Sequence, residues 1–366
     1  METWLVTGGA GFIGSNFVQL IVHQDKQIKV VVLDKLTYAG NFSNLKSITR
    51  YARFHFIKGD ISDRQLLSKI FKKYKPTNVI HFAAESHVDR SIDSPEVFIH
   101  TNIIGTFELL EATRIYLKTQ LPLVQNHFRF LHISTDEVYG SLGQRGLFSE
   151  NSRYCPRSPY SATKAASDHL VHAYFETYRL PILMVHCSNN FGPMQFPEKF
   201  VPLTILNAIE GMEIPVYGDG RNVRDWVFVE DFCKAIIVVL QKGQVGDTYN
   251  VGGKSEKMNI EVVQEICAQL NHLYPASKNE KLKKQRVFNY EELIRFVKDR
   301  PGHDRRYAMN IQKIEKKLGW TPKYSFSQGL NRTIRWYLHN KKWCAEIKNK
   351  YARQRLGLLN EKSAKE

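Results

Sequence analysis

A glycine-rich turn near the N-terminus is the feature that most constrains the fold of this chain. The apolar run 4–7 leads into Gly8, Gly11 and Gly14, and an amphipathic segment follows at 16–22. We expect a buried strand, a tight turn, and a helix whose first amide groups can bind a pyrophosphate. The spacing is GxxGxxG rather than the standard GxGxxG, so the pattern needs support from a second feature.

The second expected strand supplies that support. An apolar run at 29–33 ends at Asp34, about twenty residues after the last glycine, where a carboxylate can accept both hydroxyls of an adenosine ribose. Asp34 therefore favours NAD over NADP. The adjacent Lys35 leaves the alternative open, because a cation there can tolerate a ribose phosphate.

Two further apolar runs predict strands that end at the same edge of a parallel sheet. The run 54–58 is followed by Asp60 and Ile61, and the run 78–82 is followed by Ala83, Ala84 and Ser86. Ligands of doubly wound folds bind at the carboxyl ends of the strands. The chain is therefore predicted to be α/β, with a doubly wound parallel (Rossmann) sheet and a smaller C-terminal lobe that binds substrate. At 366 residues it is long for one domain.

A tyrosine and a lysine four residues apart indicate redox chemistry. The segment 161–178 is predicted to be helical, which places Tyr160 and Lys164 on one face. A lysine ammonium beside a phenol favours the phenolate, so Tyr160 can remove a proton from an alcohol whose carbon loses hydride. Taken alone, the same spacing is also typical of an ordinary solvated helix face.

Two adjacent carboxylates narrow the reaction further. The expected strand 128–133 is followed by Ser134, Thr135, Asp136 and Glu137, at the same edge of the sheet. Elimination of water from a sugar needs one group that takes a proton from carbon and one that gives a proton to the leaving hydroxyl. If the environment separates their pKa values, Asp136 is the acid and Glu137 the base. The alternative is a carboxylate pair that merely caps a helix or faces solvent.

These residues belong to motifs that resemble the dTDP-glucose 4,6-dehydratases of the extended short-chain dehydrogenase/reductase superfamily. The resemblance covers roughly residues 4 to 340, in the order TGGAGFIG, HFAAESHVDRSI, STDEVYG, SPYSATKAASDH, CSNNFGP, FPEKFVPLTILNAIEG, YGDGRNVRDWVFVEDF, YNVGG and DRPGHDRRYAM. It departs at His186, where relatives vary and often have arginine, and at 277–298, which is longer and more charged than usual.

The resemblance implies a redox-neutral cycle on a nucleotide-bound glucose. Tyr160 deprotonates the C4 hydroxyl while NAD takes the C4 hydride, and Thr135 hydrogen-bonds that oxygen. The 4-ketone acidifies the C5 proton, which Glu137 removes while Asp136 protonates the departing C6 hydroxyl. The hydride then returns to C6 to give a 4-keto-6-deoxy sugar, as in deoxysugar (for example dTDP-rhamnose) biosynthesis. Because NADH is reoxidised in each turnover, the cofactor is expected to stay bound.

The resemblance also implies binding residues and an architecture. The cofactor positions are Phe12, Ile13, Asp34, Lys35, Thr37, Asp60, Ile61, Ala83, Ala84, Thr101, Tyr160, Lys164 and Asn190. The substrate positions are Ser86, Thr135, Asn189, Glu198, Lys199, Pro215, Tyr217, Arg224, Asn259, Arg300 and His303. We expect an NAD-binding domain at 1–187 with 226–252, a nucleotide-sugar-binding lobe at 188–225 with 253–340, and a basic tail at 341–366. A homodimer through a four-helix bundle, formed by the helix after Ser94 and the Tyr160 helix, is implied.

Composition argues against several other classes. No apolar run is long enough to span a bilayer, and the N-terminus is not typical of a signal peptide. The five widely spaced cysteines are typical of a reduced, cytoplasmic protein, and no metal site is expected. The formal charge of +16 is dispersed, without the aromatic and basic platform of an RNA-binding module, so no nucleic-acid or membrane partner is expected.

Two other functional classes share part of the pattern. A nucleotide-sugar 4-epimerase has the glycine turn and the Tyr160/Lys164 pair but does not need Asp136 and Glu137. A catalytically silent scaffold protein would tolerate the loss of Tyr160, Lys164 or Thr135, yet all three are present. The nucleotide stays open between dTDP and UDP, because a methyl group contributes only about 1 to 3 kcal/mol to discrimination. Similarity across the C-terminal lobe favours dTDP.

Overall fold

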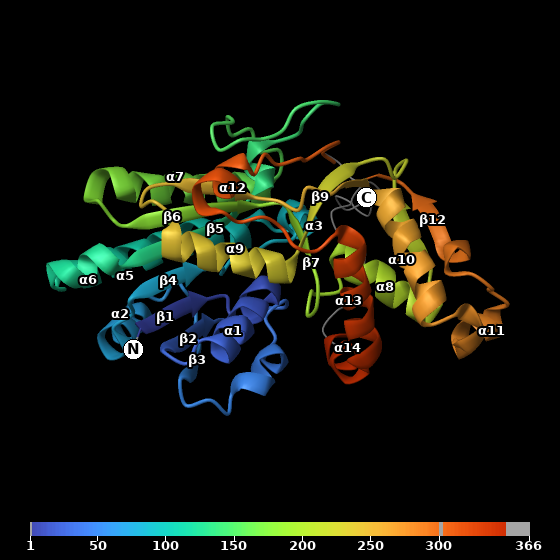
Figure 1. The fold of residues 1–366 in the computed structure, drawn as a ribbon, viewed down its shortest axis with the longest axis horizontal. Coiled ribbons are helices and arrows are strands. Elements are labelled where there is room, and N and C mark those ends of the chain that lie inside the picture. Colours follow the sequence, from blue (N-terminus) through green and yellow to red (C-terminus); the bar gives the residue numbers. More distant parts are fainter. Residues whose placement is uncertain (1, 300–302, 349–366) are drawn as a thin grey trace, which may run out of the picture.

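The computed structural model describes residues 2–299 and 303–348, and its centre is a seven-stranded parallel sheet (Figure 1). The strand order is β10-β6-β5-β4-β1-β2-β3. The strands are β1 (Glu2–Thr7), β2 (Ile28–Asp34), β3 (Phe54–Lys58), β4 (Asn78–His81), β5 (Arg129–Thr135), β6 (Ile182–Cys187) and β10 (Thr248–Val251). The α/β class and the doubly wound parallel sheet predicted from the sequence are confirmed.

The order of the strands explains where a ligand can bind. β1 pairs with β2 on one side and with β4 on the other, so the chain reverses its direction of travel across the sheet at the β1/β4 boundary. The strands end there at Thr7, Asp34, His81 and Thr135, all at the same edge of the sheet. A crevice outside the carboxyl ends at such a reversal is where α/β sheets bind their ligands.

Helices cover both faces of the sheet because its strands are apolar on both sides. α1 (Phe12–Gln24) and α9 (Val229–Lys242) lie on one face, and α2 (Arg64–Tyr74), α5 (Thr106–Lys118) and α7 (Pro159–Tyr178) lie on the other (Figure 1). Alternate residues of one strand enter different cores: Val6 packs in the α1/α9 core and Leu5 in the α2/α5/α7 core.

The segment between β4 and β5 is less regular than a single helix. α3 (Val88–Asp93) and the one-turn α4 (Pro95–Phe98) lead into a π-helix, η2 (Ile99–Gly105), which continues as α5; α6 (Pro122–His127) follows. A Cβ on Gly105 would lie 2.6 Å from the side chain of Ile61, so glycine lets the helix approach the end of β3. Short 3₁₀ helices, η1 (Phe42–Ile48) and η3 (Asp136–Tyr139), follow β2 and β5.

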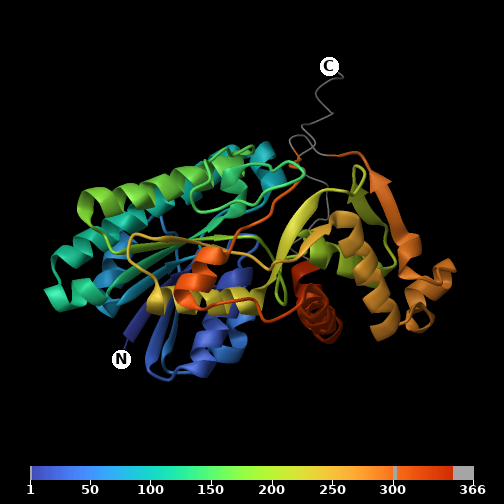
Figure 2. The ribbon, with the colours of Figure 1, turned by 45° about the horizontal axis from the view of Figure 1, so that its top comes forward.

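A second lobe stands beside this sheet (Figure 2). It contains a three-stranded sheet of β7 (Asn189–Phe191), β9 (Val223–Phe228) and β11 (Glu256–Met258), and a pair of β8 (Ile214–Tyr217) with β12 (Ile294–Val297). Its helices are α8 (Phe200–Glu210), α10 (Asn259–Leu273), η4 (Ala276–Lys278), α11 (Glu280–Gln285), η5 (Tyr290–Leu293) and α13 (Phe326–His339). α12 (Gln312–Leu318) packs on β10 and α9 of the first part.

The first eight residues of the expected basic tail form a docked helix, α14 (Lys341–Lys348). Trp343 is buried, and its indole Nε1–H donates to the Asn44 Oδ1 in η1 at 2.7 Å. Asn44 Nδ2 in turn donates to the carbonyl of Ala10 in the glycine-rich turn at 3.0 Å. The C-terminal helix is thus connected to the turn between β1 and α1.

Truncation of that tryptophan is expected to destabilise the whole fold. Trp343→Ala removes a large buried side chain and leaves the Asn44 amide oxygen without its donor, at a cost of about 3 to 5 kcal/mol. The melting temperature should fall by several degrees. Lys342→Ala, an exposed change on the same helix, is the control and should leave it unchanged; equal melting curves for the two variants would contradict the docking of α14.

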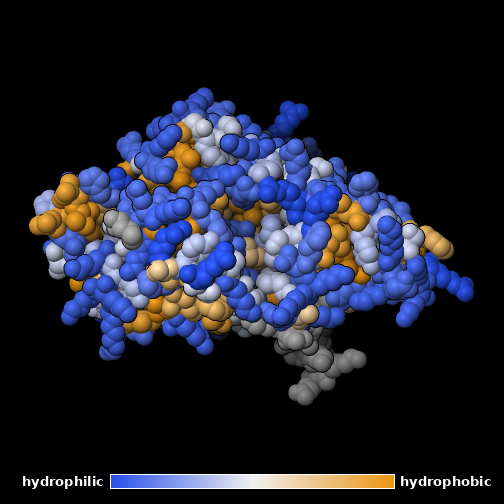
Figure 3. Space-filling view, turned by 60° about the horizontal axis from the view of Figure 1, so that its bottom comes forward, coloured by the Kyte–Doolittle hydropathy of each residue, from blue (hydrophilic) through white to orange (hydrophobic). Residues whose placement is uncertain are grey.

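Large apolar side chains are exposed at several places on the surface. Across residues 2–299 and 303–348, the structure contains no helix that is long and apolar enough to cross a membrane. The face in Figure 3 is mostly hydrophilic, and hydrophobic side chains gather at its left end around α6, where Leu121 and Leu123 are exposed.

Candidate active site

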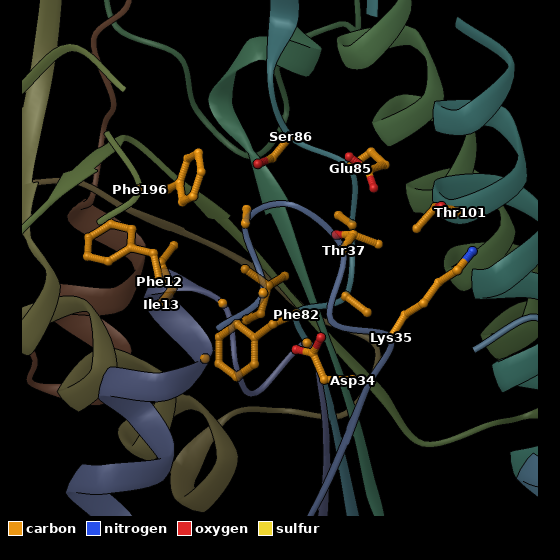
Figure 4. Close-up of a pocket in the computed structure, with 18 of the residues that line it drawn as sticks. Phe12, Ile13, Asp34, Lys35, Thr37, Phe82, Glu85, Ser86, Thr101 and Phe196 are labelled. Carbon is orange, nitrogen blue, oxygen red and sulfur yellow. The ribbon is translucent and has the colours of Figure 1, made fainter. Parts of the chain in front are cut away.

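A cavity of about 250 Å³ lies at the strand edge where the sheet order reverses. Figure 4 shows Phe12, Ile13 and Phe196 on one side of it and Thr37, Lys35 and Thr101 on the other. It is lined from the glycine-rich turn, the ends of β2, β4 and β5, the start of α7, and the segment that enters the second lobe. The cavity therefore joins the two lobes.

The glycine-rich turn is shaped as a cradle for an anion. Gly8 has a φ of +69°, and a Cβ there would lie 2.5 Å from the backbone nitrogen of Ala83. A Cβ on Gly14 would meet the carbonyl oxygen of Gly8. Gly11 caps α1 without a side-chain hydrogen bond, so the first amide groups of the helix are not occupied by a capping side chain. This geometry fits a pyrophosphate.

A methyl group at position 14 tests the cradle directly. Gly14→Ala forces the turn apart from α1, which should lower the free energy of unfolding by about 1 to 3 kcal/mol and reduce the amount of NAD that copurifies with the protein. Gly143→Ala is the matched control, because a Cβ there would meet nothing within 4 Å. Equal NAD content in both variants would argue against a cofactor role for the turn.

Asp34, the last residue of β2, is hydrogen-bonded to the glycine-rich turn. Its Oδ2 accepts a hydrogen bond from the Ala10 amide at 2.9 Å and its Oδ1 accepts one from the Leu36 amide at 2.8 Å. Burial raises the pKa of Asp34, and these two hydrogen bonds oppose that shift. Lys35, which left room for NADP, forms an ion pair with Asp60 at 2.7 Å. The arrangement fits a ribose with free hydroxyls better than a ribose phosphate.

Most of the residues assigned to the cofactor from the sequence meet in this one cavity. Its lining includes Gly8, Gly11, Phe12, Ile13, Gly14, Asp34, Lys35, Thr37, Asp60, Ile61, Ala83, Ala84, Thr101, Tyr160 and Lys164. Asn190 is not part of the lining, and its side-chain amide donates to the carbonyl of Ser188 at 3.1 Å.

The carboxylate pair sits on the short helix η3, directly after β5. Thr135 caps this helix by accepting a hydrogen bond from the Glu137 amide at 3.3 Å. Asp136 is 2% exposed, and its Oδ2 has no hydrogen-bond partner among the described residues. Burial, helped by the charges of Glu137 and Asp225, raises the pKa of Asp136 well above its usual value. Asp136 therefore keeps its proton to higher pH than an exposed aspartate does, as a proton donor requires. Neither Asp136 nor Glu137 is itself part of the cavity lining, which ends at Thr135 on this strand.

The Tyr160/Lys164 pair begins α7, whose start is fixed by a capping box between Ser158 and Ser161 with Pro159 at the first position. Burial and the nearby Glu137 raise the pKa of Tyr160, and a hydrogen bond with Thr135 opposes this. The Lys164 ammonium donates to the carbonyl of Ile133 at 2.9 Å. The sequence pattern predicted that Lys164 lowers the pKa of Tyr160; in this structure burial dominates and the phenol is protonated.

The residues assigned to the substrate fall into two groups. Ser86, Thr135, Glu198 and Lys199 line the same cavity. The other substrate positions that the structure describes lie outside this lining: Asn189, Pro215, Tyr217, Arg224 and Asn259 in the strands and α10 of the second lobe, and His303 in the segment between β12 and α12. Arg224 donates to the carbonyls of Val223 and Asp304 (2.8 and 2.9 Å), and the rings of Tyr217 and His303 meet edge to face. Arg300 lies outside the described residues.

The structure adds residues that were not assigned a role from the sequence. Glu85, Cys187, Gln195 and Phe196 all line the cavity. Burial, with repulsion from Glu198, raises the pKa of Glu85 to about 7. Glu85 stands next to Ser86 in the motif HFAAESHVDRSI, so its position was visible, but its burial beside Glu198 depends on a contact between distant segments.

Comparison with known proteins agrees with this geometry. The family model described as GDP-mannose 4,6 dehydratase matches residues 5–333. A dTDP-glucose 4,6-dehydratase of Xanthomonas campestris pv. campestris is 53% identical, over 98% of this chain and 99% of its own length. The crystal structure of the dTDP-glucose 4,6-dehydratase of Bacillus anthracis in complex with NAD is 44% identical, with a TM-score of 0.82 over 95% of this chain and 100% of that one.

Epimerases share the fold at lower identity. The UDP-glucose 4-epimerase of Thermus thermophilus, solved with NAD, is 27% identical, with a TM-score of 0.78 over 93% of this chain and 100% of that one. Sequence identity to the dehydratases is much higher, at 53% and 44%, and this chain has the Asp136/Glu137 pair on η3. The chain belongs to the dTDP-glucose 4,6-dehydratases of the extended short-chain dehydrogenase/reductase superfamily.

Proposed function

We propose that the protein is an NAD-dependent hydro-lyase that converts dTDP-glucose to dTDP-4-keto-6-deoxyglucose and water. The observation that carries this proposal is the pairing of Asp136, whose pKa is raised by burial, with Glu137 on η3, directly after Thr135 in the lining of a cavity suited to NAD. Identity of 53% to a dTDP-glucose 4,6-dehydratase over nearly the whole chain supports the same substrate. The product belongs to deoxysugar biosynthesis, and the expected cytoplasmic location accords with five cysteines that are all free.

Each side chain has a separate task in this reaction. Bound NAD supplies the acceptor for the C4 hydride, which is later returned to C6. Tyr160 takes the proton of the C4 hydroxyl as the phenolate. Burial disfavours the phenolate, so this role needs a positive charge close by, and Lys164 is the cation on the same face of α7. Thr135, which hydrogen-bonds Tyr160, holds the C4 oxygen.

The elimination follows from the acidity that the 4-ketone gives to C5. Glu137 removes the C5 proton, and Asp136 donates its proton to the C6 hydroxyl, which leaves as water. Hydride returns to C6, and C5 takes back a proton. Ser86, Glu198 and Lys199 line the cavity as groups that can orient the sugar, and Arg224 and Tyr217 in the second lobe are proposed to hold the nucleotide.

Exchange with solvent tests the elimination separately from redox activity. When dTDP-glucose is incubated with the enzyme in D₂O, the product should carry deuterium at C5, because that position is deprotonated and reprotonated in every turnover. NMR of the product measures it. An epimerase would yield dTDP-galactose without solvent deuterium, and that result would refute the dehydratase assignment.

The homodimer is proposed from the surface of the helices around the cofactor end. Val97, Ile99, Ile104, Ile115 and Tyr178, on α4, η2, α5 and α7, expose large apolar side chains to solvent. These helices can pair with those of a second copy as a four-helix bundle. Ile115→Asp should halve the mass measured by light scattering, whereas Lys118→Asp on the same helix should not; a monomeric wild-type protein would contradict the bundle.

A further inference from the structure

A buried polar network behind the cavity contains groups that the reaction above does not use. Its centre is Asp168 on α7, which is 2% exposed and lies one turn after Lys164. Its Oδ1 accepts a hydrogen bond from His132 at 3.1 Å. Its Oδ2 contacts three donors: the hydroxyls of Ser134 (2.8 Å) and Tyr154 (3.1 Å) and the His186 ring (3.0 Å).

Four donors around one carboxylate are typical of an ionised group. Burial alone would raise the pKa of Asp168, but hydrogen bonds from His132 and His186 outweigh it and hold the pKa far below its usual range. Such a charge cannot be left uncompensated in an interior. Lys164, four residues earlier on the same helix, is a buried cation that is 4% exposed; burial lowers the pKa of Lys164, and the charge of Asp168 opposes that shift.

His132 stands between the two charges. Its Nε2 lies 3.1 Å from Asp168 Oδ1 and 3.4 Å from the Lys164 ammonium nitrogen. Burial and the charge of Lys164 lower the pKa of His132 to about 4, so it is neutral. The neutral ring therefore lies between the Asp168 carboxylate and the Lys164 ammonium and cancels the charge of neither.

His186 on β6 extends the network to the carboxylate turn. Its Nε2 lies 3.0 Å from Asp168 Oδ2, and its Nδ1 lies 2.9 Å from the hydroxyl of Tyr139, the last residue of η3. Tyr139 donates to the Asn250 Oδ1 at 3.0 Å, and the Asn250 amide is itself oriented by the carbonyl of Phe148.

We propose that Asp168 is a positioning residue, whose buried carboxylate is the counter-charge of Lys164 and, through His186 and Tyr139, the anchor of the turn that carries Asp136 and Glu137. The Asp168 carboxylate then positions both the Tyr160/Lys164 pair and the Asp136/Glu137 pair. Ser134, the residue before Thr135, is held by the same carboxylate. The inference rests on the roles proposed above for Lys164, Asp136 and Glu137.

A pH profile separates a charge role from a purely structural one. The titratable groups around Lys164 are Tyr160 and Asp168 on α7, His132 on β5, His81 on β4 and Cys187 at the end of β6. Asp168→Asn keeps the size of the side chain and removes its negative charge, so Lys164 should lose its proton at lower pH and the alkaline limb of kcat should move down by about one pH unit or more. Tyr154→Phe removes a neutral donor to the same oxygen and should leave that limb in place. Equal limbs in wild type and Asp168→Asn would overturn the proposal.

A double-mutant cycle in thermal unfolding tests the same pairing without substrate. Asp168→Asn leaves Lys164 buried without its counter-charge, so adding Lys164→Met should recover part of the melting temperature that Asp168→Asn loses. Additive losses would contradict the pairing. If Asp168→Asn is recovered unfolded, the double variant must be recovered folded for the proposal to stand. Because this cycle needs no turnover, its failure is distinct from a failure of the proposed function.

Discussion

Glu137→Gln is expected to stop water elimination while leaving the first oxidation in place. Glutamine keeps the shape of the side chain but cannot take the C5 proton, so formation of the 4-keto-6-deoxy product should fall by about 10²- to 10⁴-fold. Tyr160, Lys164 and Thr135 are untouched, and hydride transfer from C4 should continue. Because the reduced cofactor can no longer be reoxidised at C6, its absorbance should accumulate on the enzyme after dTDP-glucose is added.

An exposed glutamate in the second lobe provides the matched control for Glu137→Gln. Glu280→Gln, on α11 in the second lobe, changes an exposed carboxylate to the same amide and should keep wild-type product formation. Product formation by Glu137→Gln at the rate of the control would show that Glu137 is not the base. Absence of any reduced cofactor in the variant would instead show that the substitution also blocks the first step.

Asp136→Asn is expected to slow elimination and to stabilise the protein at the same time. The amide cannot donate a proton to the C6 hydroxyl, so turnover should fall by about 10²- to 10⁴-fold. Stability should move the other way because burial raises the pKa of Asp136, which makes the folded state hold that proton more tightly than the unfolded state.

The sign of the pH dependence follows from this raised pKa. A carboxyl whose folded pKa exceeds its unfolded value, about 3.9 for aspartate, loses stability as the pH rises from the unfolded value through the folded one. The asparagine variant lacks that loss, so its melting temperature should exceed that of wild type at pH 7 and approach it near pH 4. Calorimetry at both pH values measures the difference. A variant that is less stable than wild type at pH 7 would contradict the raised pKa of Asp136.

The sequence predicted the parts of the fold that rest on local patterns. The apolar runs before Asp34 and Asp60 became β2 and β3 with nearly the expected bounds. β2 was predictable because a parallel strand inside the sheet is buried on both faces and is therefore almost continuously apolar. The residues at the strand ends met in one cavity, since parallel strands bring their carboxyl ends to one edge. The π-helix at 99–105 was not foreseen, because it depends on the approach of Gly105 to Ile61.

Electrostatic detail was predicted less well than position. The spacing of Tyr160 and Lys164 indicated a shared helix face, but the direction of the Tyr160 pKa depends on burial and on Glu137, which the spacing does not show. His186 stood out in the sequence only as a departure from relatives. Its link to Asp168 joins residues from β6 and α7, and only the folded chain brings them within hydrogen-bond distance.

The central claim is that the chain removes water from dTDP-glucose with a cofactor that it retains. Mass spectrometry after incubation of purified protein with dTDP-glucose and, separately, UDP-glucose, without added NAD, tests it most directly. The account predicts loss of one water from dTDP-glucose, with slow conversion of UDP-glucose. No loss of water from either sugar, even after NAD is supplied, would contradict it.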